Sequence, residues 1–206
     1  MTSVIIDLRD PGPEEHEAVL QLLPELAEIS DAAARSRCVR IWVAAVRAGN
    51  WPDPRLAPTL PQVPVTPDAN LVAHTRRVLL GCRDVARAVG QASIHSDLDV
   101  LLEAAALHDV AKLLEYEPDG DGFRLSAIGR SLPHAAVGAQ WALAVGCPEA
   151  VARAVYVHTP SVAAVPESIE AVILFAVDQV DADASRLSVG EKPSAKRAFL
   201  GGASTR

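Results

Sequence analysis

Six histidine and aspartate residues interrupt apolar stretches of the chain. In 102-LEAAALHDVAKLLEYE-117, for example, a histidine, an aspartate and a lysine stand among leucines and alanines. A buried polar group without a partner costs about 1–3 kcal/mol, so several such groups are tolerated best when they share one partner. Imidazole and carboxylate groups together are ligands of divalent transition metals, which predicts a common metal centre. The residues concerned are His74, His108, Asp109, His134, His158 and Asp178.

Each of these residues also has a purely structural interpretation. A single inward histidine is more often a hydrogen-bonded core residue than a metal ligand, and Asp109 could pair with Lys112 three residues later. Asp178 could lie at a helix end. We favour the metal centre because all six residues occur together in one small helical body. The remaining histidines, His16 and His95, lie in polar stretches and are predicted to be at the surface.

Helical periodicity indicates how the six residues are positioned. His74 lies three residues after Leu71 and four before Val78, so it belongs to the apolar stripe of its helix and points inward. His108 and Lys112 are one turn apart and are expected to share a face. The helices predicted in this part of the chain lie at residues 68–89, 97–116, 132–145, 148–158 and 166–182.

The chain is predicted to have three parts. Two amphipathic helices between residues 13 and 49, followed by six prolines between residues 51 and 67, form an extension that could cover a cleft or form a homodimer surface. The segment 117–133 is predicted to be a loop because of its glycine, proline and aspartate content. The three parts are the N-terminal helical extension with its proline-rich connection at 1–67, the helical body at 68–187 and a mobile C-terminal tail at 188–206.

Composition limits the classes of function. The chain has 206 residues, of which 50% are hydrophobic and only 4% aromatic, and it lacks sustained period-2 alternation, which predicts a compact all-α fold. Its formal charge of −7 argues against nucleic acid or an anionic membrane as a stable partner, but not against a small anionic substrate. Three widely spaced cysteines are typical of reduced thiols in a cytoplasmic protein. We expect no membrane span and no signal peptide.

The order of the six residues is similar to that of the HD superfamily of metal-dependent phosphohydrolases, which have a helical fold. The stretch HDVAK matches the HDxxK signature of that superfamily, and His134 and His158 match the extra histidines of its HDIG-like, dinuclear-metal subset. The stretches 133-PHAAVGA-139 and 168-SIEAVILFAVD-178 also look like the catalytic domain of bacterial HD-type endoribonucleases. Four motifs resemble most those of the bacterial HD-type hydrolases that split dinucleoside tetraphosphates symmetrically. These motifs are HDVAK, 132-LPHAAVGA-139, 154-AVYVHT-159 and 172-VILFAVD-178.

This resemblance implies a centre with two divalent metal ions. Mixed imidazole and carboxylate ligands suit iron or manganese, with zinc as a further candidate. A metal-bridged hydroxide would attack phosphorus, with Asp109 and Lys112 as catalytic residues. One ion would be held by His74, His108, Asp109 and Asp178, and the other by His134, His158 and the shared Asp109.

Three basic residues are candidates for binding the substrate. Lys112 could reach a phosphate held at the metals, although a salt-bridged surface lysine is the alternative. Arg130 could hold a second phosphate, and here a surface position is the simpler interpretation. Arg186 could approach the site, whereas Arg76 and Arg77 lie off the face of the first histidine and are expected to be solvated.

Two activities fit these residues. The first is hydrolysis of a phosphate ester or anhydride in a small, nucleotide-like substrate. The alternative is that of an HD-fold mixed-valent di-iron oxygenase acting on a small polyol or phosphonate, because ligand identity does not separate the two chemistries. A regulatory module with a vestigial site is disfavoured because no ligand position is missing.

Overall fold

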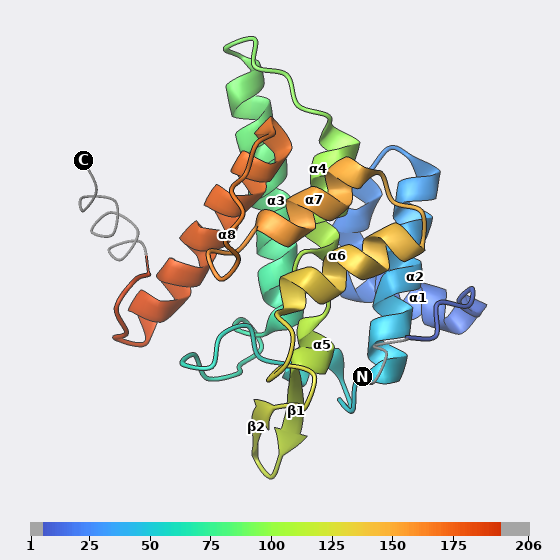
Figure 1. The fold of residues 1–206 in the computed structure, drawn as a ribbon, viewed down its shortest axis with the longest axis vertical. Helices are drawn as coiled ribbons and strands as arrows, with labels where there is room; N and C mark the ends of the chain where they lie inside the picture. Colours follow the sequence, from blue (N-terminus) through green and yellow to red (C-terminus); the bar gives the residue numbers. More distant parts are fainter. Residues whose placement is uncertain (1–5, 195–206) are drawn as a thin grey trace.

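The protein is a bundle of helices with a small hairpin at one end, as the computed structural model shows for residues 6–194 (Figure 1). The prediction of an all-α fold is confirmed. Within the described residues the sheet consists of the antiparallel strands β1 (Tyr116–Asp119) and β2 (Gly122–Leu125). Short 3-10 turns lie at Pro24–Glu28 and Pro54–Leu56. The helices are α1 (Pro13–Leu22), α2 (Ala32–Ala48), α3 (Leu71–Gly90), α4 (Leu98–Leu107), α5 (Lys112–Glu115), α6 (His134–Ala144), α7 (Glu149–Val157) and α8 (Ile169–Ser188).

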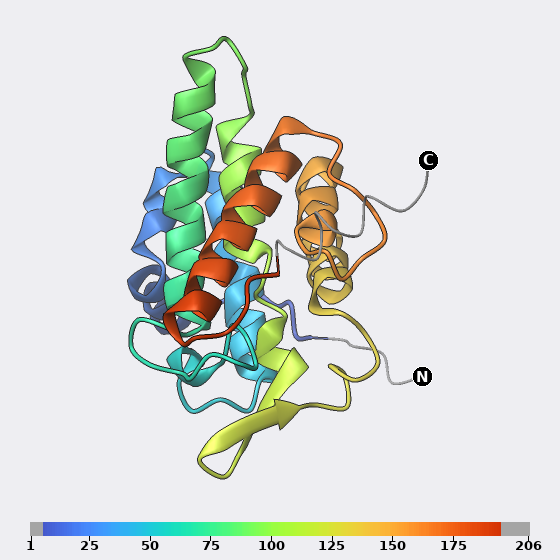
Figure 2. The ribbon, with the colours of Figure 1, turned by 90° about the vertical axis from the view of Figure 1, so that its left-hand side faces the viewer.

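Helix α4 is the central element of the core. It is mostly apolar and packs against α2, α3, α7 and α8, so that its residues from Leu101 to Leu107 are buried. Figure 2 shows α3 and α8 side by side, with α6 and α7 on the other side of α8. The first pair approaches closely at Gly81, where an added Cβ would lie 2.7 Å from Val177 Cγ1. This close approach brings the inner faces of α3 and α8 together.

The N-terminal helices share this core. Trp42 of α2 is fully buried, and its indole N–H donates to the carbonyl of Ala106 in α4 at 2.8 Å. Arg37 donates to both carboxylate oxygens of Glu103 at 2.7 and 2.8 Å, which joins the same two helices. The hydrophobic core therefore runs without a break from the extension into the body. The predicted domain boundaries after residues 67 and 187 stay predictions.

The predicted helix at 97–116 is wrong as a single helix. It ends at Leu107, and residues 108–111 form tight turns in which the amide of Lys112 donates to the carbonyl of Asp109 at 2.9 Å. The predicted loop at 117–133 is also partly wrong, because its first part forms the hairpin. Gly120 has φ +58° at the hairpin turn, a conformation that glycine adopts without strain. Strands of four residues are too short to show a clear alternation.

Helix ends differ from the predictions by a few residues. Helix α3 begins at Leu71 rather than residue 68, because the side chain of Asn70 caps it by accepting from the amide of Ala73. Helix α8 begins after the Ser168 cap and continues to Ser188. In the predicted tail, the amide of Ser194 donates to Asp183 at 2.7 Å, so the chain folds back along α8. The rest of that tail, residues 195–206, lies outside the described residues.

Two further expectations concern membrane-spanning helices and the state of the cysteines. No helix among the described residues has the length and apolar character needed to cross a membrane. The three cysteines are free and buried, as expected for reduced thiols.

Candidate metal centre

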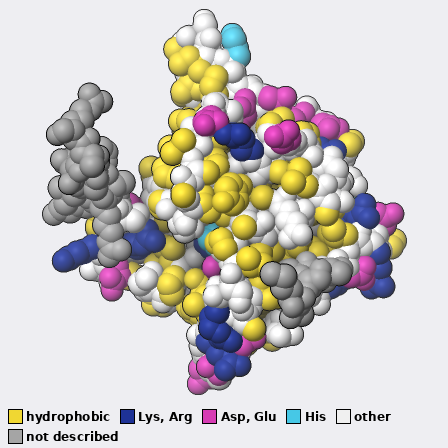
Figure 3. Space-filling view, in the orientation of Figure 1, with side chains coloured by type: hydrophobic (Ala, Val, Ile, Leu, Met, Phe, Trp, Pro, Cys, Tyr) yellow, Lys and Arg dark blue, Asp and Glu magenta, His cyan; other side chains and the backbone are white. Residues whose placement is uncertain are grey.

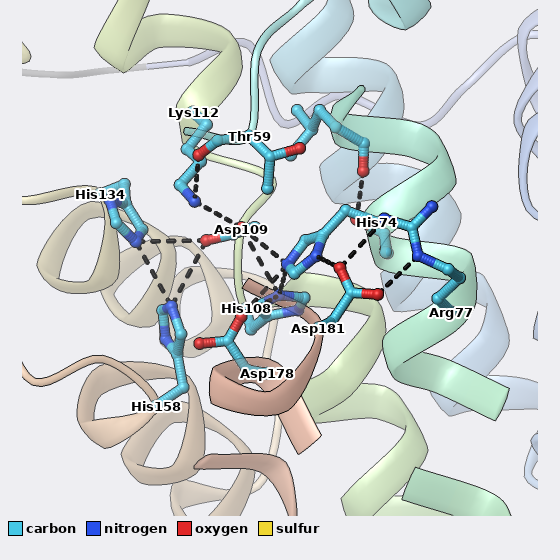
Figure 4. A network of polar contacts seen from close by, with 12 residues as sticks. Thr59, His74, Arg77, His108, Asp109, Lys112, His134, His158, Asp178 and Asp181 are labelled. Carbon is cyan, nitrogen blue, oxygen red and sulfur yellow. Dashed lines mark hydrogen bonds and ion pairs between the residues drawn. The ribbon is translucent and has the colours of Figure 1, made fainter. Parts of the chain in front are cut away.

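Five segments of the fold deliver the six predicted ligands to one place in the interior (Figure 4). His74 comes from the inner face of α3. His108 and Asp109 lie in the turn that follows α4, and Asp178 lies on the inner face of α8. The other two are at helix ends, His134 as the first residue of α6 and His158 directly after α7. All are buried except His134, which is partly exposed.

Four of these side chains form one half of the cluster. Nε2 of His74 lies 3.1 Å from Nε2 of His108, 3.3 Å from Oδ2 of Asp109 and 3.2 Å from Oδ1 of Asp178. All four ligand atoms lie within 4.8 Å of one another. A single ion could therefore contact all four.

Asp109 also forms part of the second half. Its other oxygen, Oδ1, lies 3.2 Å from Nε2 of His134 and 3.4 Å from Nε2 of His158, and those two nitrogens are 3.3 Å apart. Each oxygen of Asp109 thus faces a different group of side chains. A carboxylate in this position could contact an ion in either group.

The outward nitrogen of every ring faces an oxygen. Nδ1 of His108 lies 2.7 Å from the carbonyl of Ala105, and Nδ1 of His158 lies 2.6 Å from the carbonyl of Val155. A carbonyl only accepts, so both rings carry their proton on Nδ1 and direct the Nε2 lone pair to the centre. Nδ1 of His74 and of His134 face carboxylates instead. Four lone-pair nitrogens therefore converge with two carboxylates.

These residues fit a divalent transition metal. Ring nitrogens that face each other with lone pairs repel unless a proton or a cation lies between them. Oδ1 of Asp109 is buried and has no hydrogen-bond partner among the described residues. Buried groups of this kind are normally satisfied, and a metal ion satisfies imidazole and carboxylate donors together.

The charges of the cluster also suit metal binding. Burial lowers the pKa of His108 to about 4, so this ring is neutral at pH 7. Burial acts to raise the pKa of Asp109, but the charge of Lys112 and the interactions with the surrounding imidazoles outweigh it and hold that pKa well below its usual range. Burial likewise opposes protonation of His74, yet hydrogen bonds to Asp109, Asp178 and Asp181 raise its pKa. Without a cation in the centre, a proton on His74 supplies part of the missing positive charge.

Comparison with known proteins agrees with this geometry. The family model described as HD domain matches residues 71–183, which is more than half of the chain. The chain is an HD-domain protein. The predicted membership of that superfamily is thus confirmed, and with it membership of a family whose members are in general metal-dependent hydrolases. Searches of curated proteins and of solved structures each found no match.

A cavity of about 430 Å³ opens over the candidate metal centre of this HD domain. Histidine and acidic atoms reach the surface near the middle of the face seen in Figure 3. Part of the wall comes from outside the matched region, namely the proline-rich connection before it and the end of α8 after it. The polar residues of the wall include Thr59, Lys112, Arg130, Ser161, Gln179 and Arg186.

The predicted substrate-binding residues differ in how firmly they are held. Nζ of Lys112 donates to Oδ2 of Asp109 at 2.6 Å and to the carbonyl of Thr59 at 2.9 Å. The ion pair considered as its structural alternative is therefore present, although the lysine is buried rather than at the surface. Arg130 lines the cavity and donates to the carbonyl of Leu125 at 2.6 Å. Arg186, also in the wall, pairs with Asp183 at 2.8 Å.

Sequence reasoning missed two carboxylates behind the ligands. Oδ2 of Asp181 lies 2.6 Å from Nδ1 of His74, and Oε2 of Glu115 lies 3.0 Å from Nδ1 of His134. Asp181 is three residues after Asp178 on α8, so helical spacing alone could have indicated it. Arg77 is exposed, as expected, and it also donates to both oxygens of Asp181 at 2.5 and 3.0 Å.

Proposed function

We propose that this HD-domain protein is a phosphohydrolase that cleaves a phosphate ester or anhydride of a small, nucleotide-like substrate with two divalent metal ions. One observation supports this more than any other. Asp109 directs one oxygen to a group of three further ligands and its second oxygen to a separate pair of histidines. One ion in each group would share this carboxylate.

The residues fit iron or manganese, with zinc as a third candidate, because imidazole and carboxylate donors are mixed in both groups. When bound, the ions supply Lewis acidity that activates water and neutralises phosphoryl charge. The first ion would contact His74, His108, Asp109 and Asp178. The second would contact Asp109, His134 and His158, and these three protein ligands leave it positions for water or substrate.

Basic groups in the cavity favour an anionic substrate. Two of the three N–H groups of Lys112 are used by Asp109 and Thr59, which leaves one for a phosphoryl oxygen. Arg130 would bind a second phosphate at the rim, after its guanidinium turns from the carbonyl it now contacts. These cations favour a phosphate or phosphonate over a polyol, so the test has to separate the hydrolase from an oxygenase that acts on a phosphonate.

The test combines metal analysis with turnover. Elemental analysis of protein purified without added metal, followed by a phosphatase screen with Mn²⁺, Fe²⁺ and Zn²⁺, should show bound metal and release of phosphate from a nucleotide. Asp109→Ala should abolish turnover because both ions lose a ligand, whereas Glu25→Gln, which changes only an ion pair with Arg76 far from the cavity, should not. Unchanged turnover in Asp109→Ala would contradict the proposal. A strict requirement for iron with consumption of oxygen would favour the oxygenase.

A further inference from the structure

The two halves of the centre have a similar arrangement of oxygens behind their histidine rings. In each half, one histidine directs Nδ1 to the carbonyl three residues earlier in its own helix, and the other directs Nδ1 to a carboxylate. The carbonyl-bound rings are His108 and His158. The rings that face carboxylates are His74, whose Nδ1 is hydrogen-bonded to Asp181, and His134, whose Nδ1 lies 3.0 Å from Oε2 of Glu115 without the geometry of a hydrogen bond.

The two carboxylates lie behind the two rings that have no backbone carbonyl to orient them. His74 lies in the first turn of α3 and His134 is the first residue of α6, so neither ring follows the end of a helix and neither has a helix-terminal carbonyl behind it. A carboxylate behind a ligating ring fixes the proton on Nδ1 and makes Nε2 more basic. Each carboxylate therefore has both an orienting and an electronic effect on one ligand.

The surroundings of the two carboxylates differ. Asp181 is held by the guanidinium fork of Arg77, which neutralises part of its charge. Among residues 6–194, Glu115 pairs with no lysine or arginine, and its side chain lines the cavity beside His134. Its position depends on the tight turn and α5, whose first residue is Lys112.

We propose that Asp181 and Glu115 are positioning residues that set the metal affinity of the two halves separately, Asp181 through His74 and Glu115 through His134. This inference rests on the metal centre of the proposed function. It assigns a role to residues that contact no ion or substrate themselves. Arg77 supports Asp181 in that role but is not required for the hydrogen bond to the ring.

The experiment measures metal binding by the full-length protein, not turnover. Chelator-treated protein is titrated with Mn²⁺ by calorimetry for the wild type, Asp181→Asn and Glu115→Gln. Each variant should weaken the binding of one ion by about 10–100-fold and leave the other within a few-fold. In a His134→Gln background, which retains the first half, Asp181→Asn should still weaken binding, whereas Glu115→Gln should have no further effect.

Two controls separate positioning from simple loss of structure. Arg77→Gln removes the ion pair between α3 and α8 but leaves the carboxylate behind His74, so it should cost much less affinity than Asp181→Asn. Glu25→Gln breaks the neighbouring ion pair with Arg76 on α3 and should change nothing. In metal-free protein labelled with ¹⁵N at histidine, Asp181→Asn should shift the Nδ1 resonance of one ring, and Arg77→Gln should shift it far less.

The outcomes distinguish this proposal from the proposed function. If the wild type binds no Mn²⁺, Fe²⁺ or Zn²⁺, the metal centre itself is overturned. If the wild type binds two ions and releases phosphate but both carboxylate variants bind metal like the wild type, only the positioning role is overturned. Equal weakening of both ions by either variant, or an equal effect of Arg77→Gln, would also overturn it.

Discussion

At the scale of single residues, the constraints on Asp109 are the most severe in the protein. It is almost fully buried, accepts a hydrogen bond from Lys112 through one oxygen and faces four imidazoles. A carboxylate in such a position is stable only when cations surround it. Lys112 supplies one positive charge, and the metal ions of the proposed function would supply the rest. The same lysine lines the cavity, so it could contact a substrate as well as Asp109.

Lys112→Met should lower kcat by about 100-fold or more, because one charged donor to the phosphoryl group is lost while the side chain keeps its length. Metal content should stay at the wild-type level, since no ligand changes. Steady-state kinetics with elemental analysis checks both. Turnover within twofold of the wild type would show that Lys112 serves only as the ion-pair partner of Asp109.

At the scale of elements, the position of α4 depends on its contacts with α2. The buried pair of Arg37 and Glu103 joins these helices, and Sγ of Cys147 also lies 3.2 Å from the same carboxylate. Because His108 and Asp109 directly follow α4, this pair contributes to the position of the turn that carries them.

Removing one partner of this pair should be strongly destabilising. Arg37→Ala should lower the free energy of unfolding by about 3–5 kcal/mol, because Glu103 is left buried without its cation. Urea unfolding followed by circular dichroism measures this. The double variant Arg37→Met with Glu103→Leu should recover much of the loss, since no buried charge remains. A loss as large in the double variant would indicate that packing, not the ion pair, is responsible.

At the scale of the whole molecule, the centre joins segments from distant parts of the chain. One ion in the first half would join α3, α8 and the turn after α4, and one in the second half would join α6 and α7 to that same turn. Metal binding should therefore stabilise the whole bundle and not a local loop. The connection at 51–67 adds a wall to the cavity without contributing a predicted ligand.

Each bound Mn²⁺, at 100 times the dissociation constant of its site, should add about 2.7 kcal/mol to stability, which corresponds to a rise in Tm of about 5–10 °C per ion for a chain of this size. Scanning calorimetry with and without a chelator measures the shift. Asp109→Ala should show no rise at the same Mn²⁺ concentration. A wild-type Tm independent of metal would argue against a centre that links the helices.

Much of the site could be predicted because the relevant signals are local. Polar residues at helical spacing within apolar runs indicated which side chains point inward, and their types indicated a metal centre, so all six candidates lie together in the fold. The helical class followed from composition and periodicity in the same way. These properties depend on neighbours within one or two turns, which the sequence displays directly.

Only the tertiary structure decided which groups stand behind the ligands. Asp181 meets His74 across 107 positions of the chain, and the carbonyl of Thr59 meets Lys112 across 53. No periodicity within a helix specifies a partner on another helix, and a backbone carbonyl has no side-chain signal at all. The break after Leu107 belongs to the same category, because residues 108–111, which direct Asp109 toward both halves, are buried among the packed helices.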